Sequence, residues 1–194
     1  MAFFRTVSLS EQIPAVTGDG VVLRAPQMSD CAEWAALREA SRGFLTPWEP
    51  TWPADDLTRP SFRRRIRRYF EDQRSDLAYA FFIFRKHDYV LLGGLTLANI
   101  RRGVAQAGSL GYWIGEPFAR RGLMSGAVQA LVPFGFGSLR LHRLEAACIP
   151  TNTASIRLLE KAGFVREGYA REYLCINGLW QDHLLFGCVS SGRP

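Results

Sequence analysis

The pattern of apolar and polar positions divides the chain into short strand-like runs and amphipathic helical segments. Strand-like runs are rich in β-branched and aromatic residues and end at turn-forming residues. Those nearest the middle of the chain follow one another through short polar turns, which indicates an antiparallel meander. The sequence predicts strands over residues 21–24, 79–85, 90–99, 107–114, 143–148, 164–165, 171–176 and 183–189.

Helical periodicity separates these strands in four places. The second helical segment carries apolar residues on one face and arginines on the others, so it is amphipathic and strongly basic. In the third, Pro133 lacks a backbone N–H and should kink or shorten the helix. Gly163 is suited to end the fourth. One predicted helix begins after Ser29 or Asp30 and another after Gly122, while the other two run over Arg59–Arg74 and Thr153–Ala162.

The order of these elements predicts one mixed α/β (α+β) domain with a central sheet and helices on its faces. No internal repeat or linker interrupts the pattern, so the single domain is expected to span residues 1–194, with its core at about 20–190. Asn177 and Gly178 between the last two strands are typical of a tight hairpin turn.

Composition places the chain among ordinary globular proteins and argues against several classes. Of 194 residues, 47% are hydrophobic and 22% charged, and no apolar run is long enough to span a membrane. Because Met1–Glu11 lacks a basic and apolar leader pattern, we expect a cytoplasmic protein. The four cysteines and three histidines show no ligand spacing, so no metal site is predicted.

The net charge of +6 favours an anionic partner. Arginines cluster at Arg63–Arg68, and such a cluster can bind RNA with a steep dependence on salt. The same pattern also suits a solvated helix face that binds nothing. Both interpretations stay open at this point.

Two segments carry a strand, a turn and a polar helix start in succession. The first, residues 111–124, places Gly122 at the start of a helix, where unpaired N–H groups attract an anion. Arg120 and Arg121 can add charge-assisted hydrogen bonds there. The second, residues 150–164, begins its helix at Thr153 with Thr151 or Asn152 as the cap, and it includes Ser155. Phosphate binding at the first segment is therefore a reasonable hypothesis.

Together these segments resemble the acetyl-coenzyme A signature of the GCN5-related N-acetyltransferase (GNAT) superfamily, in which the pyrophosphate loop follows the fourth strand. The resemblance covers nearly the whole chain and extends to the ribosomal-protein-alanine N-acetyltransferases of the RimJ and RimL type, above all RimJ. It implies a mostly antiparallel sheet splayed between its fourth and fifth strands. The further matching segments are Phe44–Pro53, Gly122–Met124, Leu141–Arg143, Glu167–Ala170, Tyr173–Leu174, Asn177–Gly178, Trp180 and Asp182–His183.

The resemblance also implies which residues meet acetyl-coenzyme A. Arg121, Gly122, Leu123 and Met124 would line the pyrophosphate, while Trp113 and Ile114 would lie beside the pantetheine arm. Asn152 and Ser155 would face the cosubstrate, with Ser155 a candidate proton donor to the leaving thiolate. The family usually has Gln or Arg three residues before the central glycine, whereas this chain has Ala119.

Acetyl transfer to an amine requires a neutral amine, so a carboxylate near the thioester should take its proton. Glu167 ranks first because related acetyltransferases carry Glu at the matching position. Glu116, next to the predicted loop, ranks second, and Glu145 is a third candidate that could instead pair with an arginine. Tyr112, Tyr169 and Tyr173 are further polar-tipped groups that could reach the cleft.

The expected acceptor is the N-terminal α-amino group, of Ala or Ser, of a ribosomal protein, acetylated by direct transfer in a ternary complex. Trp48, Glu49 and Trp52 are the candidates for the substrate side, with Glu49 attracting a cationic N-terminus and the indoles forming walls. The alternatives are a small amine acceptor, such as an aminoglycoside, polyamine or amino acid, and a ribosome- or RNA-binding module that uses Arg63–Arg68.

Overall fold

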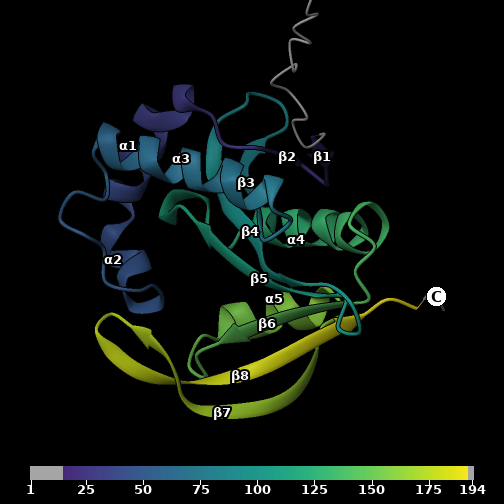
Figure 1. Cartoon of the computed structure of the whole chain (residues 1–194). Helices are drawn as coiled ribbons and strands as arrows, with labels where there is room; N and C mark the ends of the chain where they lie inside the picture. Colours follow the sequence, from purple (N-terminus) through teal and green to yellow (C-terminus); the bar gives the residue numbers. More distant parts are fainter. Residues whose placement is uncertain (1–14, 192–194) are drawn as a thin grey trace, which may run out of the picture.

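The computed structural model describes residues 15–191, so the expectations for Met1–Glu11 and for the last three residues lie outside the described residues. Eight strands form one sheet, and helices cover both of its faces (Figure 1). The elements are β1 (Val16–Thr17), β2 (Val21–Arg24), α1 (Cys31–Ala40), α2 (Arg42–Leu45), α3 (Arg59–Arg74), β3 (Tyr79–Arg85), β4 (Leu91–Arg101), β5 (Ala107–Ile114), α4 (Leu123–Pro133), β6 (Arg143–Cys148), α5 (Thr153–Lys161), β7 (Val165–Ile176) and β8 (Leu179–Val189).

The strands lie in the order β1-β2-β3-β4-β5-β6-β8-β7. Every neighbouring pair is antiparallel except β5 and β6, which are parallel and joined through α4. The predicted mixed fold with a mostly antiparallel sheet is confirmed. Because the two-residue strand β1 precedes the others, the fourth and fifth strands of the prediction are β5 and β6.

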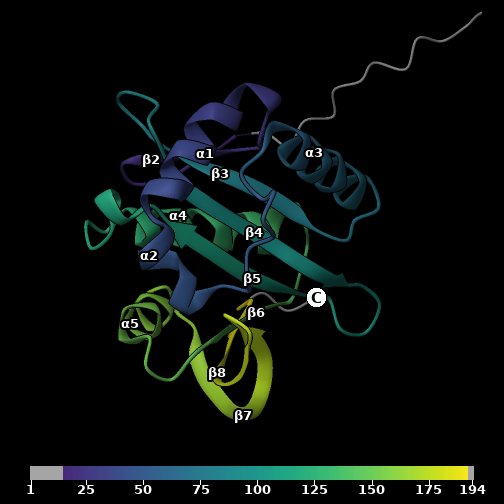
Figure 2. The ribbon, with the colours of Figure 1, turned by 90° about the vertical axis from the view of Figure 1, so that its left-hand side faces the viewer.

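Alternation along β3 explains why the sheet is covered on both faces. Phe81 and Ile83 pack with the helices α4 and α5, whereas Phe82 and Phe84 point the other way, toward α1 and α3. Successive side chains of a strand point to opposite faces, so a strand that is apolar at every position needs cover on both sides. Figure 2 shows α1 and α3 in front of the sheet and α4 behind it.

Three local features differ from the predicted pattern or refine it. Residue 165 and residues 171–176 belong to one long strand, β7, which begins just after Phe164, because bulges near Arg166 and Ala170 let the pairing with β8 continue. The α-helix α4 ends at Pro133 and continues as a π-helical turn to Ser138. The predicted hairpin turn is confirmed, since Asn177 and Gly178 have φ angles of 48° and 79°.

Candidate functional site

The strands β5 and β6 pair only over their first residues. Their register runs from Ala107 opposite Arg143 to Leu110 opposite Ala146, yet β5 continues to Ile114 and β6 to Cys148. The two strands therefore separate toward their C-terminal ends, as the ribbon shows (Figure 1). This opening is the splay between the fourth and fifth predicted strands that the resemblance implies.

Side chains of β5 and α5 meet across this opening. The Tyr112 hydroxyl lies 2.6 Å from Ser155 Oγ. Asn152 caps α5, and its Oδ1 accepts a hydrogen bond from the Ser155 backbone N–H at 3.0 Å. The structure thus brings Ser155 and Asn152 together at the opening and adds Tyr112 to them.

Burial controls the protonation of the groups at this opening. Desolvation raises the pKa of Tyr112 well above its usual range, although its hydrogen bond with Ser155 lowers it in part. Burial likewise raises the pKa of the neighbouring Cys148 thiol. Tyr112 is therefore a protonated hydroxyl at neutral pH, which is the form that can donate a proton.

The start of α4 lies one short loop after β5. Gly122 precedes the helix with a φ of 78°, a left-handed conformation that favours glycine, and Arg120 has a φ of 58°. The first backbone N–H groups of α4 have no intrahelical partner. Arg120 and Arg121 are exposed, whereas Met124 is buried in the core, so only its backbone can meet a ligand here.

Trp113 and Ile114 point to opposite faces of the sheet, as neighbours on a strand must. Ile114 packs against the core on the α4 and α5 side, the side that holds Tyr112 and Ser155. Trp113 packs with the smaller cluster under α1 and α3. Of the two residues predicted beside the pantetheine arm, only Ile114 therefore lies on the face of Ser155.

The candidate carboxylates lie at different ends of the opening. Glu167 accepts hydrogen bonds from Arg143, the first residue of β6, and this ion pair lowers the pKa of Glu167. Glu145 pairs with Arg101 and Arg143. Both carboxylates therefore lie at the closed end of the β5–β6 pair. Glu116 is exposed just beyond the open end of β5, where its backbone N–H donates to Ser41 Oγ at 2.9 Å.

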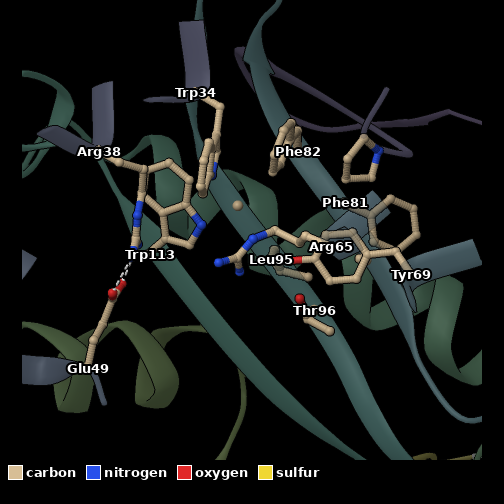
Figure 3. Close-up of a pocket in the computed structure, with 13 residues that line it drawn as sticks. Trp34, Arg38, Glu49, Arg65, Tyr69, Phe81, Phe82, Leu95, Thr96 and Trp113 are labelled. Carbon is tan, nitrogen blue, oxygen red and sulfur yellow. Dashed lines mark hydrogen bonds and ion pairs between the residues drawn. The ribbon is translucent and has the colours of Figure 1, made fainter. Parts of the chain in front are cut away.

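A pocket of about 200 Å³ lies on the opposite face of the sheet, under α1 and α3 (Figure 3). Five of its thirteen lining residues are aromatic, and one of them, Trp113, belongs to the end of β5 beyond its pairing with β6. Gly94 on β4 makes room for this indole, because a Cβ there would clash with Trp113 Nε1. The principal lining residues are Trp34, Arg38, Glu49, Arg65, Tyr69, Phe82, Thr96 and Trp113.

Glu49 lines this pocket, and its carboxylate is already bound by other side chains of the chain. Its two carboxylate oxygens accept hydrogen bonds from Arg38 at 2.7 and 2.6 Å, and Trp52 Nε1 donates to it at 2.7 Å. The Arg38 guanidinium also stacks on Trp52 at 3.9 Å. Trp48, in contrast, is partly exposed and does not line the pocket. Of the three predicted substrate residues, only Glu49 reaches the pocket wall.

Sequence reasoning missed Arg38 and Thr96 and assigned Arg65 only to the basic helix face. The spacing of Trp34 and Arg38 places them on one face of α1, but nothing local identifies the partner of Arg38. Across residues 15–191, no group of three potential metal-ligating side chains comes together. None of the helices described there is long and apolar enough to cross a membrane.

Comparison with known proteins agrees with this geometry. The model of the acetyltransferase (GNAT) domain matches residues 21–165. The probable N-acetyltransferase YjcK of Bacillus subtilis is 37% identical over 89% of this chain and 96% of its own length. The [ribosomal protein uS5]-alanine N-acetyltransferase of Escherichia coli is 32% identical over 88% of each chain.

A solved structure adds a ligand to the comparison. Mycobacterium smegmatis RimJ in complex with CoA-disulfide superposes with a TM-score of 0.85 at 28% identity, over 95% of this chain and 90% of the other. The splayed parallel pair, the helix start at Gly122 and the family match point to the same conclusion. The chain belongs to the acetyltransferase (GNAT) domain family.

Proposed function

We propose that the chain transfers an acetyl group from acetyl-coenzyme A to the N-terminal α-amino group, on Ala or Ser, of a ribosomal protein. The observation that carries this proposal is the opening between β5 and β6, bridged by Tyr112 and Ser155. The Tyr112 hydroxyl at this opening can donate a proton. The chain also belongs to an acetyltransferase family. The aromatic pocket on the other face supplies room for an acceptor.

The residues around the opening suit acetyl-coenzyme A. Unpaired N–H groups at the start of α4 can receive the pyrophosphate, and Arg120 and Arg121 are free of ion pairs within the described part of the chain. The edge of β5 beyond Leu110 has backbone groups for the pantetheine amides. The coenzyme complex of the mycobacterial relative supports this placement.

When bound, acetyl-coenzyme A supplies an activated acyl group whose thiolate leaves as the amine nitrogen bonds the carbonyl carbon. Side chains of this protein transfer two protons, one to the leaving sulfur and one from the amine. Tyr112, held by Ser155, donates one to the leaving sulfur. A carboxylate takes the other from the amine through water, and we place Glu116 before Glu167 in this role because Glu116 lies at the open end of β5.

The ribosomal acceptor is supported by the Escherichia coli relative, which acts on the alanine of ribosomal protein uS5 by its name. Thiol release from acetyl-coenzyme A, measured with Ala- and Ser-starting ribosomal peptides beside free amines and aminoglycosides, tests the proposal. Turnover on the peptides is expected. Turnover confined to small amines would replace this acceptor with the small-amine alternative.

A specific observation also favours a second role, docking on ribosomal RNA through α3. Arg59, Arg63 and Arg67 recur every four residues on one exposed face, and none has an ion pair within residues 15–191. Their neighbours Arg64 and Arg65, in contrast, pair with Asp55 and Asp56. A row of arginines without ion pairs can bind the phosphate backbone of RNA.

The same exposed face continues toward the end of α3. Arg74 stacks on Phe70 at 5.7 Å, and Phe70 is 44% exposed. Aromatic rings beside basic residues can stack on unpaired bases. Because Arg65 and Tyr69 of the same helix line the pocket, RNA bound to the outer face of α3 would hold a ribosomal protein near the acceptor site.

A further inference from the structure

The acceptor pocket contains two buried hydrogen-bond donors that nothing in the described chain satisfies. The Nε atoms of Arg38 and Arg65 are both buried and have no hydrogen-bond partner among residues 15–191. Arg38 as a whole is only 7% exposed. Because an unsatisfied buried donor is costly, such a pair of donors in one pocket calls for a ligand that accepts hydrogen bonds.

The remaining contacts hold both guanidinium groups in place. Arg38 donates through its two terminal nitrogens to Glu49 and lies between the Trp52 and Trp113 rings. Arg65 donates to Asp56, which is 5% exposed, and packs over the Trp34 ring at 5.1 Å. Glu49 and Asp56 thus bind terminal nitrogens of the two arginines, and both Nε atoms stay without a hydrogen-bond partner among the described residues.

The pocket reaches from the end of β5 across β4 toward α3. Figure 3 shows the Arg65 guanidinium projecting into the space between Trp113 and Thr96. Arg65 of α3, Thr96 of β4 and Trp113 of β5 line the same pocket, so the pocket extends from α3 to the end of β5. The volume of about 200 Å³ is suited to one side chain rather than to a folded segment.

We infer that this pocket binds the acidic side chain of the residue that follows the acetylated one, with Arg65 and Arg38 as specificity-determining residues. The inference rests on the proposed function. A carboxylate fits the two fixed guanidinium donors better than an amide because charge-assisted hydrogen bonds are the stronger ones. Trp34, Phe82 and Trp113 in the lining limit the hydration of this contact and strengthen the difference.

Glu49 and Asp56 limit how strongly the pocket prefers an acidic side chain to its amide. Each already neutralises one arginine, so the selection comes from hydrogen-bond geometry more than from net charge. A preference of roughly tenfold for an acidic residue over its amide is the expected scale. A lysine at the same position should be the least favoured, because it offers no acceptor to the two donors.

The test compares peptides that begin Ala-Glu, Ala-Gln and Ala-Lys and are otherwise identical. We expect kcat/KM for the Ala-Glu peptide to exceed that for Ala-Gln about tenfold. Arg65→Met should bring this ratio close to one while turnover on Ala-Gln persists. The matched control, Arg64→Met, removes an exposed arginine of the neighbouring pair and should leave the ratio unchanged.

Because Arg65→Met leaves the buried Asp56 without its partner, the double variant Asp56→Asn/Arg65→Met provides a second comparison, with circular dichroism to verify folding. Equal kcat/KM for Ala-Glu and Ala-Gln in the wild type would overturn the inference alone. If no peptide is acetylated, the proposed function fails instead. Calorimetric titration of the same peptides then still decides the inference, which predicts tighter binding of Ala-Glu and is overturned by equal binding.

Discussion

The Tyr112 hydroxyl and the Ser155 Oγ lie 2.6 Å apart and join β5 to α5 at the point where β5 and β6 separate. This contact holds a proton donor at the open end of the sheet. The two residues are 43 positions apart in the chain, and each comes from an element that the sequence predicts correctly. Their contact places two hydroxyl groups at the opening between β5 and β6.

Replacing Tyr112 with Phe should lower kcat by roughly a hundredfold, because general acids contribute about that much or more. The KM for acetyl-coenzyme A should change little, since the ring keeps its packing. Steady-state thiol release measures both constants. Tyr173→Phe, on the exposed surface of β7, is the control and should have no effect. An unchanged kcat in Tyr112→Phe would remove this residue from the mechanism.

The position of the carboxylates predicts different effects for two amide substitutions. Glu116→Gln should lower kcat near neutral pH, and the loss should shrink as the pH rises above about 8, where an α-amino group is neutral without help. Glu167→Gln should leave the rate profile unchanged because Glu167 lies at the closed end. Rate profiles from pH 6 to about 9.5 decide between them. A large loss only in Glu167→Gln would restore Glu167 as the first candidate.

Glu167 should instead affect stability in a pH-dependent way. Arg143 lowers the pKa of Glu167 in the folded protein, so the ion pair stabilises the fold above the unfolded pKa and stops doing so as the pH falls through the folded one. The difference in unfolding free energy between wild type and Glu167→Gln should therefore be present at pH 7 and disappear in acid. The effect should be small because the pair is exposed.

Urea denaturation at pH 7 and at about pH 3 measures this difference. Glu71→Gln, an exposed carboxylate without an ion pair within the described residues, is the matched control. A difference that grew in acid would contradict the stabilising role of the Arg143–Glu167 pair.

The basic face of α3 should bind RNA in a salt-dependent manner. The triple variant Arg63→Gln/Arg67→Gln/Arg74→Gln should weaken binding to a ribosomal RNA helix. In a plot of the logarithm of the binding constant against the logarithm of the salt concentration, the slope should become less steep by about three units at most. Peptide acetylation should be unchanged. Fluorescence anisotropy at several salt concentrations measures the binding.

A second triple variant, Arg157→Gln/Arg166→Gln/Arg171→Gln, removes the same charge from exposed positions outside α3. Equal weakening in both triple variants would show that only net charge matters and would remove α3 as a docking face.

Much of the fold could be predicted because its signals are local. The strands Tyr79–Arg85 and Ala107–Ile114 and the helix Arg59–Arg74 have the predicted bounds. β7 was predicted as two pieces, because its bulges interrupt the alternation and can be recognised only beside β8. The helix starts at Gly122 and Asn152 were also predictable, since capping depends on nearby residues.

The candidate site was predictable only in part. Asn152 and Ser155 were placed at the opening in advance, but the position of Glu167 beside Arg143 depends on how β6, β7 and β8 pair. Arg38 meets Glu49 only because the chain folds back over the sheet, and there the backbone N–H of Asn177 donates to the Glu49 carbonyl. Such partners have no signature in the spacing of residues.

The sequence by itself determined the types of element and the two helix starts, of which the one at Gly122 suits phosphate, and its motifs resemble those of the family. The element types and the helix starts depend on side-chain periodicity and capping within a few residues. The tertiary structure alone decided which carboxylate lies at the open end, and that Trp113, Arg38 and Arg65 line one pocket under α1 and α3. These features arise from contacts between distant segments, where strand register and helix placement set which side chains meet.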